Sequence, residues 1–144
     1  MKKCSDVMTK DVVTCTPQNT IPEVARLMKT EDIGPILIVD NEQSRTLVGI
    51  VTDRDIVLKV IAEERDVNTT RVGDVMSKKL VTCRPDDDVD VAMKAMAQFQ
   101  LRSIPVVGEN MTLLGIISQA DVATRVDAPE KTGEVVKEIS EQNT

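Results

Sequence analysis

Two copies of one short motif place a hydroxyl and a carboxylate where they could bind a phosphorylated sugar. Residues 49–55 (Gly-Ile-Val-Thr-Asp-Arg-Asp) recur as residues 115–121 (Gly-Ile-Ile-Ser-Gln-Ala-Asp). A helix that begins just after Thr52 or Ser118 exposes backbone N–H groups to a phosphate, and the hydroxyl adds a donor. Three residues on, the carboxylate of Asp55 or Asp121 can accept hydrogen bonds from a ribose diol. The motif therefore indicates a nucleotide site in each copy.

The same residues also suit a purely structural role. Thr52 and Ser118 are good helix caps, and Asp55 and Asp121 are favourable charges in a first helical turn. The residue types alone leave both interpretations open.

The motif belongs to a longer internal repeat. Residues 6–17 recur as residues 74–85, an offset of 68, and residues 47–52 match residues 113–118. Only two copies exist, which indicates a pseudo-twofold pair and excludes a solenoid. We expect repeat 1 over residues 1–65, repeat 2 over 66–127, and a charged tail over 128–144 that carries apolar residues at helical spacing. The polar residues 62–71 are the expected linker.

Each repeat predicts the element order strand, helix, strand, strand, helix. The first strand, over 12–16 or 80–83, stops at a proline. Thr20 and Glu23 predict a capping box for the first helix of repeat 1, and Asp86 to Asp88 supply carboxylates at the start of its copy. Hairpins follow over 36–51 and 104–117, and second helices begin at Asp53 and Gln119. The predicted fold class is α/β of the α+β type, with two β-α-β-β-α repeats packed sheet to sheet.

Composition excludes several functions. The 144-residue chain has no His and one aromatic residue, so imidazole catalysis, His-ligated zinc and aromatic stacking on single-stranded nucleic acid are absent. A net charge of −6 disfavours a nucleic-acid surface. No segment is apolar enough to cross a membrane, and we expect a cytoplasmic protein.

The sulfur-containing residues are expected to be structural. Cys4, Cys15 and Cys83 are odd in number and lack the spacing of a metal site or a disulfide framework, which suits a reducing compartment. Cys15 and Cys83 are interpreted as half-buried small hydrophobes, with a reactive thiol as the alternative. The methionines are interpreted as core residues.

Both ends of each repeat resemble the cystathionine-β-synthase (CBS) domain family. The repeats begin with Asp-Val-Met, at residues 6–8 and 74–76, and end with Gly-x-x-Thr/Ser-x-x-Asp. The resemblance covers about residues 5–126. It implies a regulatory module that binds an adenine nucleotide (AMP, ADP or ATP) or S-adenosylmethionine between the repeats, forms a homodimer and signals to an effector protein. It implies no catalytic residue, no metal and no required cofactor.

The resemblance also implies that each cleft is completed by the other repeat. The expected residues of the first cleft are Thr52, Arg54, Asp55, Arg84, Arg102, Ile104 and Pro105. Those of the second are Ser118, Asp121, Thr16, Ile33 and Gly34. Arg54 and Arg102 could converge on phosphates, whereas Ala120 and Gly34 occupy the matching positions, so the first cleft is predicted to bind phosphorylated ligands more tightly. Solvated surface arginines are the alternative.

Two other functions are alternatives to ligand sensing. A scaffold with empty clefts would use the repeats only for oligomer contacts. An enzyme is disfavoured because the acidic candidates lack an evident nucleophile, metal cluster or second base.

Overall fold

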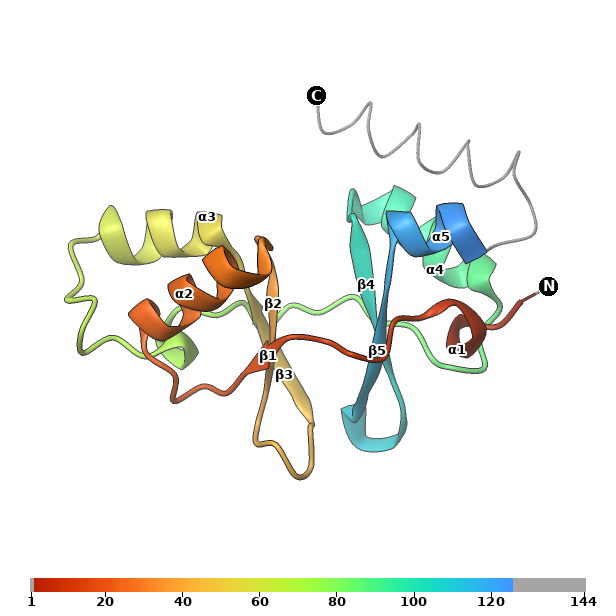
Figure 1. Ribbon diagram of the computed structural model, residues 1–144, viewed down its shortest axis with the longest axis horizontal. Helices are drawn as coiled ribbons and strands as arrows, with labels where there is room; N and C mark the ends of the chain where they lie inside the picture. Colours follow the sequence, from red (N-terminus) through yellow and green to blue (C-terminus); the bar gives the residue numbers. More distant parts are fainter. Residues whose placement is uncertain (1, 126–144) are drawn as a thin grey trace. The chain divides into compact units, whose positions relative to one another are not determined.

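The computed structural model describes residues 2–125, which form two compact units (Figure 1). The middle unit is Val13–Leu80. The terminal unit combines residues 2–12 with residues 81–125. The predicted tail over 128–144 lies outside the described residues. None of the described helices is long and apolar enough to span a membrane.

The middle unit is built on a three-stranded sheet of order β1-β2-β3. Its strands are β1 (Thr14–Cys15), β2 (Ile36–Val39) and β3 (Leu47–Val51); β1 pairs parallel to β2, and β2 and β3 form the predicted antiparallel hairpin. The helices α2 (Ile21–Glu31) and α3 (Asp53–Ile56) lie on the same side of this sheet (Figure 1). A π-helical turn, η1 (Val57–Ile61), continues α3, and a 3₁₀ turn, η2 (Val72–Asp74), follows.

The capping box predicted for α2 is confirmed. The Glu23 backbone N–H donates to the Thr20 hydroxyl at 3.3 Å, and the Thr20 N–H donates to the Glu23 carboxylate at 3.1 Å. These bonds satisfy two N–H groups that a helix start otherwise leaves without partners. The helix ends at Asp32 in the left-handed conformation.

The terminal unit repeats this arrangement with one strand fewer. Its elements are α1 (Cys4–Val7), α4 (Val89–Phe99), β4 (Ser103–Val107), η3 (Glu109–Met111), β5 (Leu113–Ser118) and α5 (Gln119–Arg125). The predicted hairpin is confirmed as antiparallel β4 and β5. Asp88 occupies the N-cap position of α4, but its side chain makes no cap hydrogen bond and instead pairs with Lys3 Nζ at 2.8 Å.

The strand predicted over 80–83 is wrong, because only a single bridge forms there, between Cys83 and Val106. In the middle unit the corresponding strand pairs twice, Thr14 with Leu37 and Cys15 with Ile38. The repeat places Pro105 at the position of Leu37. Because proline has no N–H to donate, the second parallel pair cannot form.

Each unit has its own aliphatic core, and methionine contributes to both as predicted. Met93 and Met96 are fully buried in the terminal unit, and Met28 and Met76 pack against the core of the middle unit. The interpretation of Cys15 and Cys83 as half-buried is wrong, because each is at most 4% exposed. Both occupy core positions that suit a small hydrophobe.

The segment that precedes each first strand packs against the other repeat. Thr9 pairs with Ile116 of β5 through two backbone hydrogen bonds of 2.8 and 3.0 Å, and Ser77 pairs with Ile50 of β3 in the same way. A glycine beside each pair allows this approach, because a Cβ on Gly115 would lie 2.7 Å from the Thr9 carbonyl oxygen. The packing units therefore differ from the sequence repeats at both of these segments.

Gly115→Ala should destabilise the protein by about 1–3 kcal/mol, since the added methyl group must displace the Thr9 backbone. Urea unfolding measures this difference. Gly108→Ala is the matched control, because its nearest neighbour would be the flexible end of the exposed Leu114 side chain at 3.1 Å. Equal midpoints for Gly115→Ala and the wild type would contradict the assigned close approach.

Candidate functional site

Thr52 and Asp55 form a reciprocal cap at the start of α3. The Asp55 N–H donates to Thr52 Oγ1 at 3.1 Å, and the Thr52 N–H donates to Asp55 Oδ2 at 2.9 Å. The second carboxylate oxygen, Oδ1, lies 3.2 Å from Lys59 Nζ. The structural interpretation of these residues as a cap is therefore confirmed. The cap leaves the Asp55–Lys59 ion pair near the surface. It also leaves the proton of the Thr52 hydroxyl without an acceptor among the described residues.

Ser118 and Asp121 form the same cap at the start of α5 but are more completely bonded. Asp121 Oδ2 accepts from both the N–H of Ser118, at 2.9 Å, and its hydroxyl, at 3.0 Å. Asp121 Oδ1 accepts from the hydroxyl of Thr9 at 2.9 Å. Asp121 is buried, whereas Asp55 is partly exposed. The two motifs thus make equivalent backbone hydrogen bonds. They differ in how accessible the carboxylate is to a ligand.

The start of each hairpin strand lies beside the helix start of its own unit. The Asp53 N–H donates to the Gly34 carbonyl at 3.2 Å, and the Gln119 N–H donates to the Arg102 carbonyl at 3.0 Å. Added bulk at Gly34 would contact the Asp53 carboxylate at 3.3 Å. The side chains of Arg54 and Arg102 are both exposed.

The remaining predicted residues have local roles. The Arg84 guanidinium donates to the Gly108 carbonyl at 2.9 Å, and the Thr16 N–H donates to Asn19 Oδ1 at 2.8 Å. Ile104 and Pro105 are buried in β4, and Ile33 is partly buried against the core of the middle unit. Both predicted clefts combine residues of the two units, so their assembly stays a prediction.

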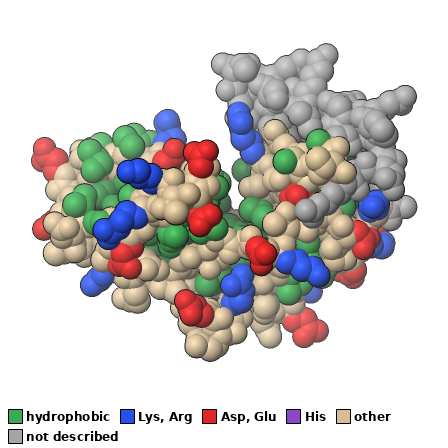
Figure 2. Space-filling view, in the orientation of Figure 1, with side chains coloured by type: hydrophobic (Ala, Val, Ile, Leu, Met, Phe, Trp, Pro, Cys, Tyr) green, Lys and Arg blue, Asp and Glu red, His purple; other side chains and the backbone are tan. Residues whose placement is uncertain are grey.

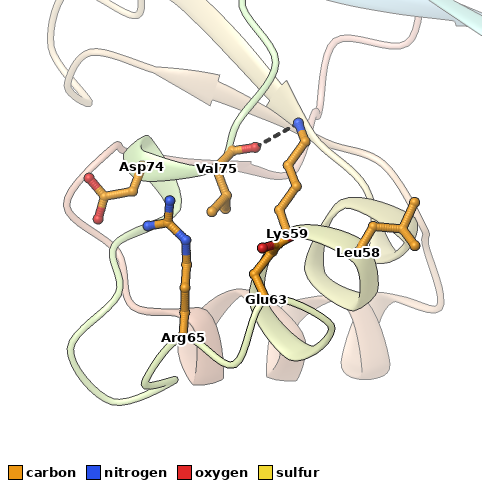
Figure 3. A pocket seen from close by; sticks show the side chains of 6 residues that line it. All are labelled: Leu58, Lys59, Glu63, Arg65, Asp74 and Val75. Carbon is orange, nitrogen blue, oxygen red and sulfur yellow. Dashed lines mark hydrogen bonds between the residues drawn. The ribbon is translucent and has the colours of Figure 1, made fainter.

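An open hollow of about 340 Å³ lies beside the Asp55–Lys59 pair in the middle unit. Its lining residues are Leu58, Lys59, Glu63, Arg65, Asp74 and Val75. Figure 3 shows the Lys59 side chain reaching the Val75 carbonyl, to which it donates at 3.1 Å. Charges of both signs line the hollow, so it has no clear preference for an anion. The Lys59 side chain, which lines the hollow, is 45% exposed.

Sequence reasoning missed three residues at these helix starts. Lys59 was detectable, because Asp55 and Lys59 have the i, i+4 spacing of a helical ion pair. Thr9 gave no local signal, since it lies 112 positions from Asp121. Gln119 is the third; its side-chain amide nitrogen is buried without a hydrogen-bond partner among the described residues. A buried donor without an acceptor is uncommon in a folded protein. The start of α5 therefore holds a polar group that a ligand could bond.

Two sequence comparisons decide the family. The sequence matches the CBS domain over residues 4–62 and again over residues 72–128. The chain belongs to the CBS domain family. Its two CBS domains carry the two Thr/Ser-x-x-Asp motifs, one in each. The CBS domain-containing protein YhcV of Bacillus subtilis is 39% identical over 99% of both chains.

Solved CBS structures share this fold. Hypoxic Response Protein I, solved with two coordinated zinc ions, superposes with a TM-score of 0.76 at 30% identity and covers 88% of this chain and 100% of its own. In residues 2–125 of the present chain, no group of three or more Cys, Asp or Glu side chains could hold a metal ion. The CBS domain pair of MJ0100, in complex with 5-methylthioadenosine and S-adenosyl-L-methionine, has a TM-score of 0.69 at 26% identity, over 85% of this chain and 94% of its own.

Thr9→Val should destabilise the protein by about 1–3 kcal/mol, because the buried Asp121 carboxylate loses a hydrogen-bond donor. Ser77→Ala is the matched control at the equivalent position of the other repeat, where the hydroxyl accepts only a long 3.4 Å bond from the Lys79 N–H. That variant should stay within about 0.5 kcal/mol of the wild type. Chemical denaturation of both variants measures the difference, and equal losses would argue against the Thr9–Asp121 contact.

Proposed function

We propose that this CBS pair is a regulatory module that binds an adenosyl ligand, with Asp55 and Asp121 as the ribose-binding carboxylates. The observation that carries the proposal is the hydroxyl–carboxylate cap, repeated at the same place in both domains. The adenosyl ligands of the MJ0100 pair support this ligand class, and the buried amide of Gln119 supports a polar ligand at α5. The specific nucleotide, AMP, ADP, ATP or S-adenosylmethionine, is left to experiment.

Ligand binding at the α3 start requires little rearrangement. A ribose diol that donates to Asp55 Oδ1 replaces the Lys59 ammonium group there. The ion pair it breaks is weak, because the Lys59 side chain is partly exposed. The released Lys59 then lies close enough to the ribose to pair with a phosphate or carboxylate of the same ligand. The Thr52 hydroxyl keeps its role as acceptor in the cap and donates its proton to the ligand.

The two motifs are proposed to differ in affinity. Each carboxylate accepts one backbone N–H, from Ser118 or Thr52. Beyond that bond, a ribose at the buried Asp121 must compete with the Thr9 and Ser118 hydroxyls, whereas at Asp55 it competes with one lysine whose side chain is partly exposed. This adds to the expectation that Arg54 and Arg102 favour phosphorylated ligands in the first cleft. The further contacts expected from Arg84, Ile104, Pro105, Thr16, Ile33 and Gly34 remain part of the proposal.

The proposed role is regulatory rather than catalytic. A ligand regulates only if it binds one arrangement of the protein better than another. An effector protein would read that change. The ligand-free scaffold is the alternative function, favoured by the complete bonding of the Asp121 carboxylate within the protein.

Calorimetric titration with ATP and 5-methylthioadenosine tests the ligand proposal. Asp55→Asn should weaken ATP binding about tenfold or more, because the amide accepts fewer hydrogen bonds from the ribose and cannot carry its charge. Asp121→Asn should have the smaller effect on ATP. Asp53→Asn is the control, since the side chain of this exposed neighbour accepts its hydrogen bond from the adjacent Arg54 N–H, at 3.0 Å.

Ligand at a hundred times its dissociation constant should also stabilise the fold by about 2.7 kcal/mol. A flat titration and an unchanged melting temperature for both ligands would favour the scaffold instead. A larger effect of Asp121→Asn than of Asp55→Asn would reverse the proposed order of the two sites.

A homodimer is also proposed, through the exposed apolar residues of η1. Val57, Leu58 and Ile61 are 46–58% exposed and lie within five residues of one another in η1. Figure 2 shows hydrophobic side chains gathered over this part of the middle unit, with Lys and Arg side chains beside them. A contiguous apolar patch of this kind is unfavourable in water and suits a second copy of the chain.

Ile61→Glu should shift the protein from dimer to monomer in light scattering after gel filtration, because the interface would bury an unpaired charge. Leu114→Glu, at an exposed apolar residue of the terminal unit, is the control and should leave the dimer intact. A monomeric wild type at the same concentration would contradict the homodimer.

A further inference from the structure

Two of the three cysteines lie against each other in the core of the terminal unit. Cys4 of α1 and Cys83 belong to one buried cluster and are 0% and 2% exposed. Their thiols are within hydrogen-bonding reach of one another. Each thiol also lies 3.8 Å from a carbonyl oxygen, of Asp88 and Pro105 respectively. The pair brings together two residues that are distant in sequence.

The other repeat shows that packing does not require this pair. Cys15 is the repeat counterpart of Cys83, and Val72 is the counterpart of Cys4. The backbones match, since the Val72 N–H donates to the Asn19 carbonyl at 2.8 Å and the Cys4 N–H donates to the Asp87 carbonyl at 2.9 Å. Val72 and Cys15 share the buried cluster of the middle unit. An aliphatic side chain therefore fills this position equally well, and the second thiol has no packing explanation.

We infer that Cys4 and Cys83 are a thiol-modification site, at which a reversible disulfide fastens the N-terminal segment (residues 2–9) to the rest of the terminal unit. This inference is independent of the proposed ligand. The fastened segment includes Thr9, whose hydroxyl bonds Asp121. Oxidation would therefore hold the Thr9 contact in place.

The chemistry requires an oxidant, which we take to be a low-molecular-weight disulfide such as oxidised glutathione. The Cys4 thiolate attacks one of its sulfurs and releases one glutathione thiolate. The Cys83 thiolate then attacks the Cys4 sulfur of the mixed disulfide and releases the second. The two protons of the cysteines pass to the two glutathione thiolates, and the two electrons of the cysteine pair reduce the glutathione disulfide.

The order of attack follows from the environment of each thiol. The hydrogen bond with Cys83 lowers the pKa of Cys4. The same contact, together with burial, raises the pKa of Cys83. Among the described residues no thiol acts on Cys15, whose pKa is raised to about 11 by burial and by the negative charge of Glu23. Cys4 is therefore the first nucleophile and Cys15 the unreactive reference.

Both thiols are buried, so oxidation must follow local opening. An exposed Lys3–Asp88 ion pair and backbone hydrogen bonds from Cys4 and Ser5 hold the beginning of the segment over residues 2–9. A segment of a folded protein can open locally at a lower free energy than global unfolding requires. The rate of disulfide formation should therefore follow the opening of residues 2–9 and not global unfolding.

The test treats the reduced full-length protein with oxidised glutathione under native conditions, alkylates the remaining thiols and maps tryptic peptides by mass spectrometry. The wild type should pass from three free thiols to one, with a linked Cys4–Cys83 peptide that dithiothreitol releases. Cys15→Ser should form the same linked peptide. Cys4→Val, which copies the aliphatic side chain of Val72, should form no Cys4–Cys83 disulfide. If Cys4→Val folds poorly, Cys83→Ser serves as the second variant and should likewise form none.

Amide hydrogen exchange gives a second readout. In the oxidised wild type, exchange at the Thr9 and Ile116 amides should slow about tenfold or more, because the opened segment is now tethered. A linked peptide that contains Cys15 would overturn the inference. So would the absence of a linked peptide in native wild-type protein, if the same protein oxidises readily once it is unfolded in urea.

Discussion

The exchange of segments between the two repeats determines most of the structure described above. Each repeat begins with a segment that pairs with the second hairpin strand of the other, Thr9 with Ile116 and Ser77 with Ile50. Glycine at positions 49 and 115 is what allows these backbones to meet. The pairing covers the strand that ends in the capping motif, so the exchanged segment and the candidate site share one strand in each unit.

The two capping motifs show that one sequence pattern can differ in how well its carboxylate is able to bind a ligand. Thr52 with Asp55 and Ser118 with Asp121 make nearly identical backbone bonds. The difference comes from outside the motif, from an exposed lysine one turn later in one case and from the Thr9 hydroxyl in the other. A cap and a ligand site therefore use the same atoms, and access to the second carboxylate oxygen is what separates the two roles.

The sequence was sufficient for the features that depend on local chemistry. The Thr20–Glu23 box, both hairpins and both second helices follow from side-chain spacing and capping, and the structure confirms them. The prediction of a strand over 80–83 was wrong because pairing there is limited by Pro105, a residue of the partner strand. Thr9 was missed for the same reason, since its relation to Asp121 arises only from tertiary packing. Lys59 was readable from its spacing and was overlooked.

The segment exchange also bears on how the chain folds during synthesis. The middle unit is contiguous, so all of its backbone pairs become available as soon as Leu80 has left the ribosome. The terminal unit needs residues at both ends of the described chain, with Thr9 and Asp121 112 positions apart. Loops of that length close slowly and late. Cys4 and Ser5 can pair once residues 85–87 have been made, whereas Thr9 must wait without its partners until Ile116 and Asp121 follow.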